Sequence, residues 1–391
     1  MSVAARVPLS SDDLGMFFLP AHVAFADHIR GGAAAIATSE AAADEPARDR
    51  AAVAALASCG LLELVSPPTG NIPSLLLCLA RELCGYLSPR ADSILAVQGL
   101  GTHAILITGS AAQRAQLREF AAGTRVAAFA LTEPEAGSDV GAIATTARAD
   151  AGGGWVLDGE KVFISNLGIA THATVIARSD AAATGSKGLS AFWVPLDAPG
   201  VHVEPLTAIA PHPIGRLILA GARIPADALI GEPGAGFKLA MQTLDTFRVS
   251  VGAAAVGMAR RALDEAVAHV RTRRQFGKPL AEQPLVQAHL ADMTVDLDAA
   301  RLLVLRAAWR KDTNYARATR EVSIAKLGAT EAAQRVIDRA VQLFGGKGVM
   351  AGAVVELMYR AIRPLRIYEG TSEIQRTIIG RAIAADGSGT P

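Results

Sequence analysis

Two short runs in the middle of the chain contain residue types that suit a flat or phosphorylated ligand. ALTEPEAGSD (130–139) ends a strand-like segment, and its small polar residues Thr132, Gly137 and Ser138 would let a ring system or phosphates approach the backbone. GEKVFISN (159–166) sets the hydroxyl of Ser165 close to the aromatic Phe163, so it could present a hydrogen bond to a flat cofactor edge. Either run alone is equally well an ordinary loop or a half-buried strand.

Three later runs place charged residues beside glycines. RRQFGKPL (273–280) ends a predicted long helix, where cations are expected because of the helix dipole. QLFGGKG (342–348) is a glycine-rich break that a helix C-cap would explain. IYEGTSEIQR (367–376) puts the carboxylate of Glu369 directly before Gly370, and Thr371 or Ser372 could cap the next helix. On its own, Glu369 is more simply a solvated loop residue.

One further motif resembles a dinucleotide-binding fingerprint. Residues 99–104 (GLGTHA) fit GxGxxA, and Glu119 follows about 20 residues later, as that fingerprint requires. The fingerprint also needs a strand–helix–strand unit, whereas the surrounding residues are predicted to be helical on both sides. We therefore predict that Gly99 and Gly101 allow close helix packing.

Hydrophobic spacing divides the chain into three parts. Residues 1–120 are predicted to be mostly helical, and residues 233–391 contain longer helical patterns over 237–274, 284–310 and 319–343, which favour an antiparallel bundle. Residues 121–232 contain short strand-like runs bounded by turn residues, which predict an antiparallel sheet or small barrel. These runs are 126–131, 155–157, 162–165, 173–177, 189–194 and 216–219, with a turn at Asp158-Gly159.

Composition narrows the class of protein. Of the 391 residues, 51% are hydrophobic and only 5% aromatic, which favours helices packed through small residues and argues against disorder. Lys and Arg number 38 against 37 Asp and Glu, so there is no basic surplus for nucleic-acid binding. The three cysteines, Cys59, Cys78 and Cys84, form no CxxC pair, so we expect buried thiols and neither a disulfide framework nor a metal site.

Targeting signals are also not predicted. Residues 1–13 have no apolar segment of the kind found in signal peptides. No stretch reaches the ~18 uninterrupted apolar residues of a membrane helix. We expect a soluble protein of the cytoplasm that does not associate with membranes.

In their order and separations, the five runs resemble those of the acyl-CoA dehydrogenase family. The resemblance covers residues 120–383 and is thin before residue 90. It implies an α+β multidomain fold with an N-terminal α-helical domain (1–120), a central β-barrel-like domain (121–232) and a C-terminal four-helix bundle (233–391). It also implies a homotetramer, a dimer of dimers, with one FAD per subunit and a place in fatty acid metabolism. The electron acceptor would be an electron-transfer flavoprotein.

The resemblance carries site residues over one by one. Phe163 and Ser165 match the residue that packs on the flavin ring and the hydroxyl donor near flavin N5, and Arg273, Gln275 and Phe276 match contacts to FAD across a dimer. The full set implied for FAD is Leu131, Thr132, Gly137, Ser138, Phe163, Ser165, Arg273, Gln275, Phe276, Gln342, Gly346, Thr371 and Glu373. The set implied for an acyl-CoA or acyl-carrier-protein thioester is Ser138, Asp245, Arg248 and Gly370.

Glu369 matches the catalytic base of the short-chain, medium-chain and glutaryl members. Some relatives keep the base near residues 244–248, but no Glu lies between Gly236 and Arg261 here. The implied reaction is α-proton removal by Glu369 and β-hydride transfer to flavin N5, which yields a trans-2-enoyl thioester. Donors to the thioester oxygen would be the flavin ribityl hydroxyl and the Glu369 backbone N–H. A desolvated carboxylate should have a raised pKa, which suits a general base.

The chain departs from the family pattern in two places. Residues 208–214 (AIAPHPI) replace the usual Gly, Arg, Ser, Thr loop, and residues 67–71 (PPTGN) replace a Gly-Gly loop. We therefore expect an unusual acyl group, whether branched, cyclic or carrier-bound. The alternatives to a dehydrogenase are an acyl-CoA oxidase that passes electrons to oxygen, a non-catalytic or nucleic-acid-binding relative, and a thiolytic or desulfinating relative.

Overall fold

The computed structural model describes residues 14–313 and 318–386. Residues 1–13, for which no signal peptide is predicted, lie outside the described part. The chain forms two compact units, each assembled from separate segments. We call Met1–Ala37, Pro73–Asp92 and Arg248–Pro391 the helical unit, and Thr38–Ile72 with Ser93–Phe247 the sheet unit.

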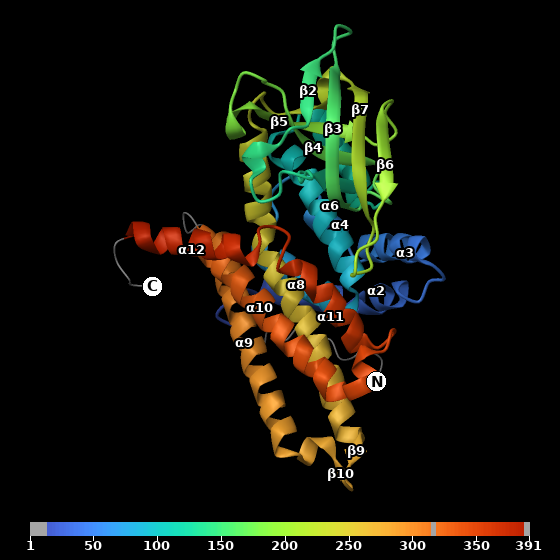
Figure 1. Ribbon diagram of the computed structural model, residues 1–391, viewed down its shortest axis with the longest axis vertical. Coiled ribbons are helices and arrows are strands. Elements are labelled where there is room, and N and C mark those ends of the chain that lie inside the picture. The colour runs from blue at the N-terminus through green and yellow to red at the C-terminus, as the bar shows by residue number, and fades with distance from the viewer. Residues whose placement is uncertain (1–13, 314–317, 387–391) are drawn as a thin grey trace. The chain divides into compact units, whose positions relative to one another are not determined.

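The sheet unit is built on one eight-stranded sheet with the order β6-β7-β3-β2-β4-β5-β8, and β1 pairs with β4 (Figure 1). The strands are β1 (Ala127–Ala130), β2 (Thr146–Ala149), β3 (Trp155–Ser165), β4 (His172–Arg178), β5 (Leu189–Pro195), β6 (Val201–Pro205), β7 (Ile214–Ile224) and β8 (Leu229–Ile230). Most pairs are antiparallel, as predicted, but β4 pairs in parallel with β1 and β2. The alternating apolar residues of β3, β4, β5 and β7 form the core of this unit.

The predicted turn at Asp158-Gly159 was wrong, because β3 runs through it as one continuous strand. Its pairing with β7 shifts register between Leu157 and Gly159, so the glycine marks a bulge. Gly159 has φ +148°, and a Cβ there would lie 2.5 Å from the Thr145 hydroxyl. A local sequence pattern does not separate such a bulge from a turn, since a glycine is common in both. Strands β2, β6 and β8 of this sheet were not predicted.

Helices α3 (Glu45–Ser58), α4 (Leu61–Val65), α6 (Pro89–Thr108) and α7 (Ala111–Ala121) lie wholly or mostly in the sheet unit, and the one that carries GLGTHA rests on the sheet. That helix, α6, begins in the helical unit. A Cβ on Gly99 would lie 2.4 Å from the Phe247 ring, and one on Gly101 would lie 2.7 Å from Ala128 O. The motif is therefore a helix that packs closely through its glycines, as predicted.

The helical unit contains the long helices (Figure 1). Its elements are α1 (Pro20–Gly31), α2 (Ala33–Ser39), α5 (Ser74–Leu87), α8 (Gly236–Thr272), α9 (Pro284–Asp312), α10 (Thr319–Phe344), α11 (Val354–Leu365) and α12 (Ser372–Asp386). α8 begins in the sheet unit, and the last residues of α2 belong to it. α10 packs against α9, α11 and α12, and α5 packs against α9. A short hairpin of β9 (Arg274–Gln275) and β10 (Lys278–Pro279) joins α8 to α9.

Glycines let the helices of this unit approach to backbone contact. A Cβ on Gly257 of α8 would lie 2.1 Å from Glu82 O of α5, and one on Gly85 of α5 would lie 2.4 Å from Ala254 O of α8. A Cβ on Gly252 of α8 would likewise lie 2.8 Å from the Val304 side chain of α9. Side chains at these positions would force the helices apart, so the small-residue packing expected from composition is confirmed.

The predicted fold class is confirmed: a helical N-terminal region, a central sheet and a C-terminal helical region follow one another along the chain. The domain boundaries at residues 120 and 232 stay predictions. Cys59, Cys78 and Cys84 are buried free thiols. Within residues 14–313 and 318–386, no helix combines the length and hydrophobicity that crossing a bilayer requires.

Candidate functional site

Backbone strain concentrates at residues that the sequence singled out. In the described part of the chain, the non-glycine residues with positive φ are Phe163 (+58°), Asn166 (+67°), Phe276 (+53°) and Glu369 (+53°). For bulky side chains this conformation is rare and costs about 1–3 kcal/mol. Such strain persists where the surroundings enforce it, commonly at functional sites. Three of these four residues belong to the predicted site.

The loop that carries Glu369 is held by its carbonyl groups. Arg248 Nε donates to Glu369 O at 3.1 Å, and Lys326 Nζ donates to Gly370 O at 2.8 Å. Gln375 Nε2 donates to Gly370 O at 3.0 Å and approaches Glu369 O at 3.4 Å. Gly370 has φ +90°, and a Cβ there would lie 2.5 Å from that amide nitrogen, so only glycine fits.

Glu369 is half-buried, and the buried oxygen of its carboxylate, Oε2, lacks a partner in the described part of the chain. Among the described residues its Oε2 has no hydrogen-bond partner, and none is found for its backbone N–H. Burial raises the pKa of Glu369 above its ordinary value of 4.5. Three cations offset part of this increase, and they are Arg81, Arg248 and Lys326. A carboxylate of raised pKa, with one buried oxygen unused, is suited to accept a proton.

Arg81 supports this region from α5. Its guanidinium is fully buried and binds Asp92 through two hydrogen bonds of 2.8 Å, while Nη1 donates to Ser250 Oγ at 3.1 Å. Burial alone would lower the pKa of Arg81, but the charge of Asp92 and its hydrogen bonds raise it well above the ordinary value. Arg81 therefore stays charged and contributes a fixed positive potential at Glu369.

Arg81, Lys326 and Gln375 were not predicted from the sequence. A signal for the first two was present, because each is a lone cation within an apolar helix face. Lys326 follows Val322 by four residues and precedes Ala329 by three on α10, and all three are fully buried. Burial lowers the pKa of Lys326 to about 8, although the charge of Glu369 acts in the opposite direction. Gln375 carries no such signal, since an amide in the first turn of a helix is ordinary.

Replacing Lys326 by Met should shift the acidic limb of the pH profile. Removing a neighbouring cation raises the pKa of Glu369 further, so the base is ionised only at higher pH. The rate of substrate-dependent flavin bleaching, measured by stopped flow against pH, should therefore begin to rise at higher pH than in the wild type. The lost charged hydrogen bond to Gly370 O should lower the free energy of unfolding by about 1–3 kcal/mol.

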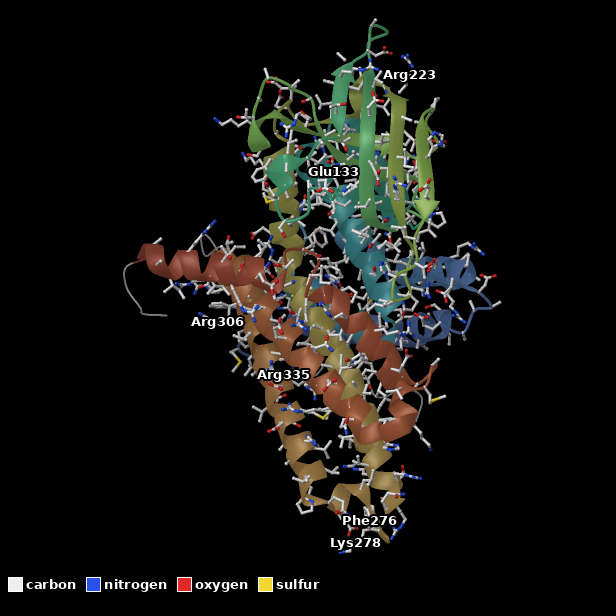
Figure 2. The ribbon with its side chains drawn as sticks, viewed as in Figure 1. Glu133, Arg223, Phe276, Lys278, Arg306 and Arg335 are labelled. Atoms are coloured by element: carbon white, nitrogen blue, oxygen red, sulfur yellow. The ribbon has the colours of Figure 1, made fainter. Side chains whose placement is uncertain are left out.

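Lys278→Met is the matched control for this substitution. Lys278 is exposed at the tip of the β9–β10 hairpin (Figure 2), so this variant should leave both the pH profile and the stability unchanged. An unshifted acidic limb in a folded Lys326→Met protein would show that Lys326 does not act on Glu369.

In the sheet unit, the runs 130–139 and 159–166 lie against each other. Lys161 Nζ contacts Glu133 Oε1 at 2.8 Å and donates to Leu131 O at 3.1 Å, and Val162 N donates to Thr132 O at 3.0 Å. Burial alone would raise the pKa of Glu133, but Lys161 holds it below the ordinary value. Burial lowers the pKa of Lys161 to about 8. This buried pair fixes Leu131 and Thr132 beside β3.

Phe163 and Ser165 stand at the end of β3. The register of β3 against β7 shifts between Lys161 and Ile164, and Phe163 is 68% exposed while Ile164 is buried. The bulge therefore turns the aromatic ring of Phe163 outward, two residues before Ser165. Asn166 anchors the strand end, because its backbone N–H donates to Pro213 O at 2.7 Å and its side-chain amide to Ala127 O at 3.1 Å.

A cavity of ≈ 570 Å³ in the helical unit gathers four predicted FAD residues. Arg273 and Gln275 line it from the segment that follows α8, and Gln342 and Gly346 line it from the end of α10 and the turn after it. Phe276 does not line this cavity; it is 93% exposed at the hairpin tip (Figure 2).

The remaining predicted residues are dispersed. Gly137 and Ser138 are exposed in the loop after β1, and Asp245 is half-buried on α8. Thr371 Oγ1 accepts from Ile374 N at 3.3 Å, so it caps α12, one of the two capping residues predicted. Glu373 lies exposed in the first turn of that helix. Their roles toward a ligand stay predictions.

Two segments of the chain match family descriptions. Residues 128–221 match the acyl-CoA dehydrogenase middle domain, and residues 234–384 match the acyl-CoA dehydrogenase C-terminal domain. The chain is 45% identical over 279 residues to the mitochondrial short-chain specific acyl-CoA dehydrogenase of Bos taurus. That alignment covers 70% of this chain and 67% of the relative.

Solved structures of acyl-CoA dehydrogenases also match the chain. Butyryl-CoA dehydrogenase from Megasphaera elsdenii matches with a TM-score of 0.85 and 31% identity, over 94% of this chain and 99% of that one. A glutaryl-CoA dehydrogenase from Mycobacterium smegmatis in complex with FADH2 matches with a TM-score of 0.85 and 25% identity, over 98% of this chain and 100% of that one.

The fold and the relatives together define an FAD-dependent oxidoreductase. The chain belongs to the acyl-CoA dehydrogenase family, as the resemblance of its five motifs predicted.

Proposed function

We propose that this chain oxidises an acyl thioester to its trans-2-enoyl product, with Glu369 as the base that removes the α-proton. The observation that carries the proposal is the Glu369 carboxylate itself. Its Oε2 is buried and lacks a partner among the described residues, and desolvation raises the pKa of the carboxyl group above 4.5. A strained loop whose carbonyls are held by Arg248, Lys326 and Gln375 keeps this carboxylate in one place.

FAD, when bound, supplies the acceptor for the β-hydride. We assign Phe163 and Ser165 to its ring, since an outward aromatic and a hydroxyl on a strained strand end suit a flat ligand. Arg273 and Gln275 would hold the diphosphate and adenine, because they line a cavity large enough for part of a dinucleotide. The other residues assigned to FAD are Leu131, Thr132, Gly137, Ser138, Phe276, Gln342, Gly346, Thr371 and Glu373.

On the substrate side, the chain supplies both charge and hydrogen-bond donors. The backbone N–H of Glu369 would donate to the thioester oxygen as negative charge develops there, an interaction worth about 3–4 kcal/mol. Arg248, Asp245, Ser138 and Gly370 would contact the rest of the thioester. The two departures from the family pattern, at 67–71 and 208–214, favour an unusual acyl group, which we propose to be branched, cyclic or carrier-bound.

Anaerobic titration tests the proposal. The purified flavoprotein should lose its visible flavin absorbance with one equivalent of an acyl-CoA that it accepts, and mass spectrometry should find the 2-enoyl product. A panel of straight, branched and cyclic acyl-CoAs, each matched by the same acyl group on carrier protein, would identify the substrate. Turnover of CoA esters alone would exclude the carrier version, and no bleaching with any thioester would contradict the proposed function.

We propose an electron-transfer flavoprotein as the acceptor, because that is what the family resemblance implies. An acyl-CoA oxidase would instead release one peroxide for each enoyl product in air. Peroxide measured during turnover separates the two, and stoichiometric release would overturn the assignment.

We also propose a homotetramer. α9 presents a stripe of exposed apolar residues at helical spacing, Leu285, Ala288, Val295, Ala299 and Leu302. Burying such a stripe against another subunit removes apolar surface from water. Phe276, exposed on strained backbone, would also be covered. The mass in solution, measured by light scattering, should be four times that of the chain, and a monomeric mass would exclude this arrangement.

A further inference from the structure

Residues 208–214, one of the two segments that depart from the family pattern, place a histidine beside the end of β3. His212, in residues 208–214, places its Nε2 3.2 Å from Ser165 Oγ. The other ring nitrogen, Nδ1, lies 2.9 Å from the carbonyl oxygen of Ala210. The segment is anchored on both sides of the ring, because Ser165 pairs with Ile214 and Asn166 N donates to Pro213 O at 2.7 Å. His212 is therefore held against Ser165 by the sheet itself.

The two contacts define which nitrogen carries the proton in the neutral ring. A carbonyl oxygen only accepts, so Nδ1 must donate to Ala210 O. In neutral imidazole the other nitrogen is then an acceptor, and Ser165 Oγ–H must donate to Nε2. The serine proton points toward the histidine, and the oxygen lone pairs remain for another partner. Ser165 is thus an acceptor toward any ligand at this edge.

We propose that His212 is a positioning residue that turns the Ser165 hydroxyl into a hydrogen-bond acceptor for the N5–H of reduced FAD. This inference rests on the proposed function, which puts Ser165 at the flavin ring. Oxidised flavin has a lone pair at N5 and needs a donor, whereas hydride transfer from the substrate adds a hydrogen there. A serine oriented as an acceptor favours the reduced form and so raises the flavin midpoint potential.

Midpoint potentials of the FAD-bound variants test the proposal. One hydrogen bond is worth about a tenfold change in an equilibrium constant. For a two-electron couple, tenfold corresponds to about 30 mV. His212→Phe should therefore lower the potential by about 30 mV, because the freed serine proton can donate to oxidised N5. His212→Gln, whose side-chain carbonyl can accept from Ser165, should keep most of the wild-type potential.

A double-mutant cycle shows whether His212 acts through Ser165. Ser165→Ala should lower the potential as well, and adding His212→Phe to Ser165→Ala should change it no further. His202→Phe is the matched control, since His202 lies exposed on β6 in the same unit, and its potential should equal that of the wild type. Additive shifts would mean that His212 acts independently of Ser165, which overturns the proposal.

NMR spectroscopy of the FAD-bound enzyme tests which nitrogen of His212 carries the proton, and it does not depend on a change in activity. In protein labelled with 15N-histidine, the signals that vanish in His212→Phe or His212→Gln belong to His212. Above the pKa of the ring, Nδ1 should give a protonated, pyrrole-like shift and Nε2 a pyridine-like shift. The reverse assignment would overturn the proposal. If the wild type is bleached normally by an acyl-CoA while His212→Phe leaves the potential unchanged, this inference fails and the proposed function stands.

Discussion

Replacing Glu369 by Gln is expected to abolish bleaching of the bound flavin by acyl thioesters while FAD binding stays intact. Gln has nearly the same shape but cannot accept the α-proton, and loss of a general base lowers rates by about 10²–10⁴-fold. The variant should unfold at the same temperature as the wild type or higher, because it removes a buried charge with an unpaired oxygen. Stopped-flow absorbance under anaerobic conditions gives the rate.

Exchange of the substrate α-proton with deuterated solvent separates the base from the hydride step. The wild type should exchange this proton with a bound saturated acyl-CoA, and Glu369→Gln should not. Glu282→Gln is the control, since Glu282 is an exposed carboxylate beyond the hairpin. Normal bleaching by Glu369→Gln would remove this residue from the mechanism and leave the reaction without a base.

Arg81→Leu should produce the largest loss of stability among single substitutions in the helical unit. It leaves Asp92, which is 1% exposed, as a buried charge without its partner. Breaking a buried pair in this way costs about 3–5 kcal/mol. Urea unfolding should show this loss. In any protein that still folds, the pKa of Glu369 should be higher because a nearby cation has been removed, so flavin bleaching should begin at a higher pH than in the wild type.

Two further variants test whether burial of the ion pair causes the loss of stability in Arg81→Leu. Arg81→Leu combined with Asp92→Leu should recover most of the stability, because a well-packed apolar pair can replace a buried ion pair. Arg223→Leu breaks a pair of similar length, 2.7 Å to Asp150, whose arginine is 64% exposed (Figure 2). Exposed pairs contribute about 0–1 kcal/mol, so this control should change little. Equal losses at Arg81 and Arg223 would contradict the role of burial.

Much of the fold could be predicted because its patterns are local. The three long helical patterns at 237–274, 284–310 and 319–343 correspond to α8, α9 and α10 within a few residues. The strands of the sheet were harder to predict than the helices. Gly159 was interpreted as a turn because a glycine with positive φ serves turns and bulges alike, and only the pairing of β3 with β7 distinguishes them. β6 is largely exposed, so its burial gives little alternating pattern.

The residues of the candidate site likewise divide into those that a local pattern predicts and those that only the folded chain brings together. Glu369 and its capped helix could be predicted from a contiguous motif, which also contains Gln375, although no role was predicted for that residue. Arg81 and Lys326 come from two other helices and meet the loop only in the folded chain. His212 was part of a segment noted only as a departure. Its contact with Ser165 depends on the register of β7 against β3, which no short run of sequence encodes.

The contacts of Gly85, Gly252 and Gly257 reverse the usual rule for making helices more stable. Glycine inside a helix normally costs about 1 kcal/mol relative to alanine, so Gly→Ala is a common stabilising change. Here the added methyl group would meet a backbone carbonyl or a packed side chain at 2.1–2.8 Å. Attempts to make this protein more heat-resistant should therefore leave these three glycines alone and begin at Gly380 of α12, where a methyl group would meet nothing within 4 Å.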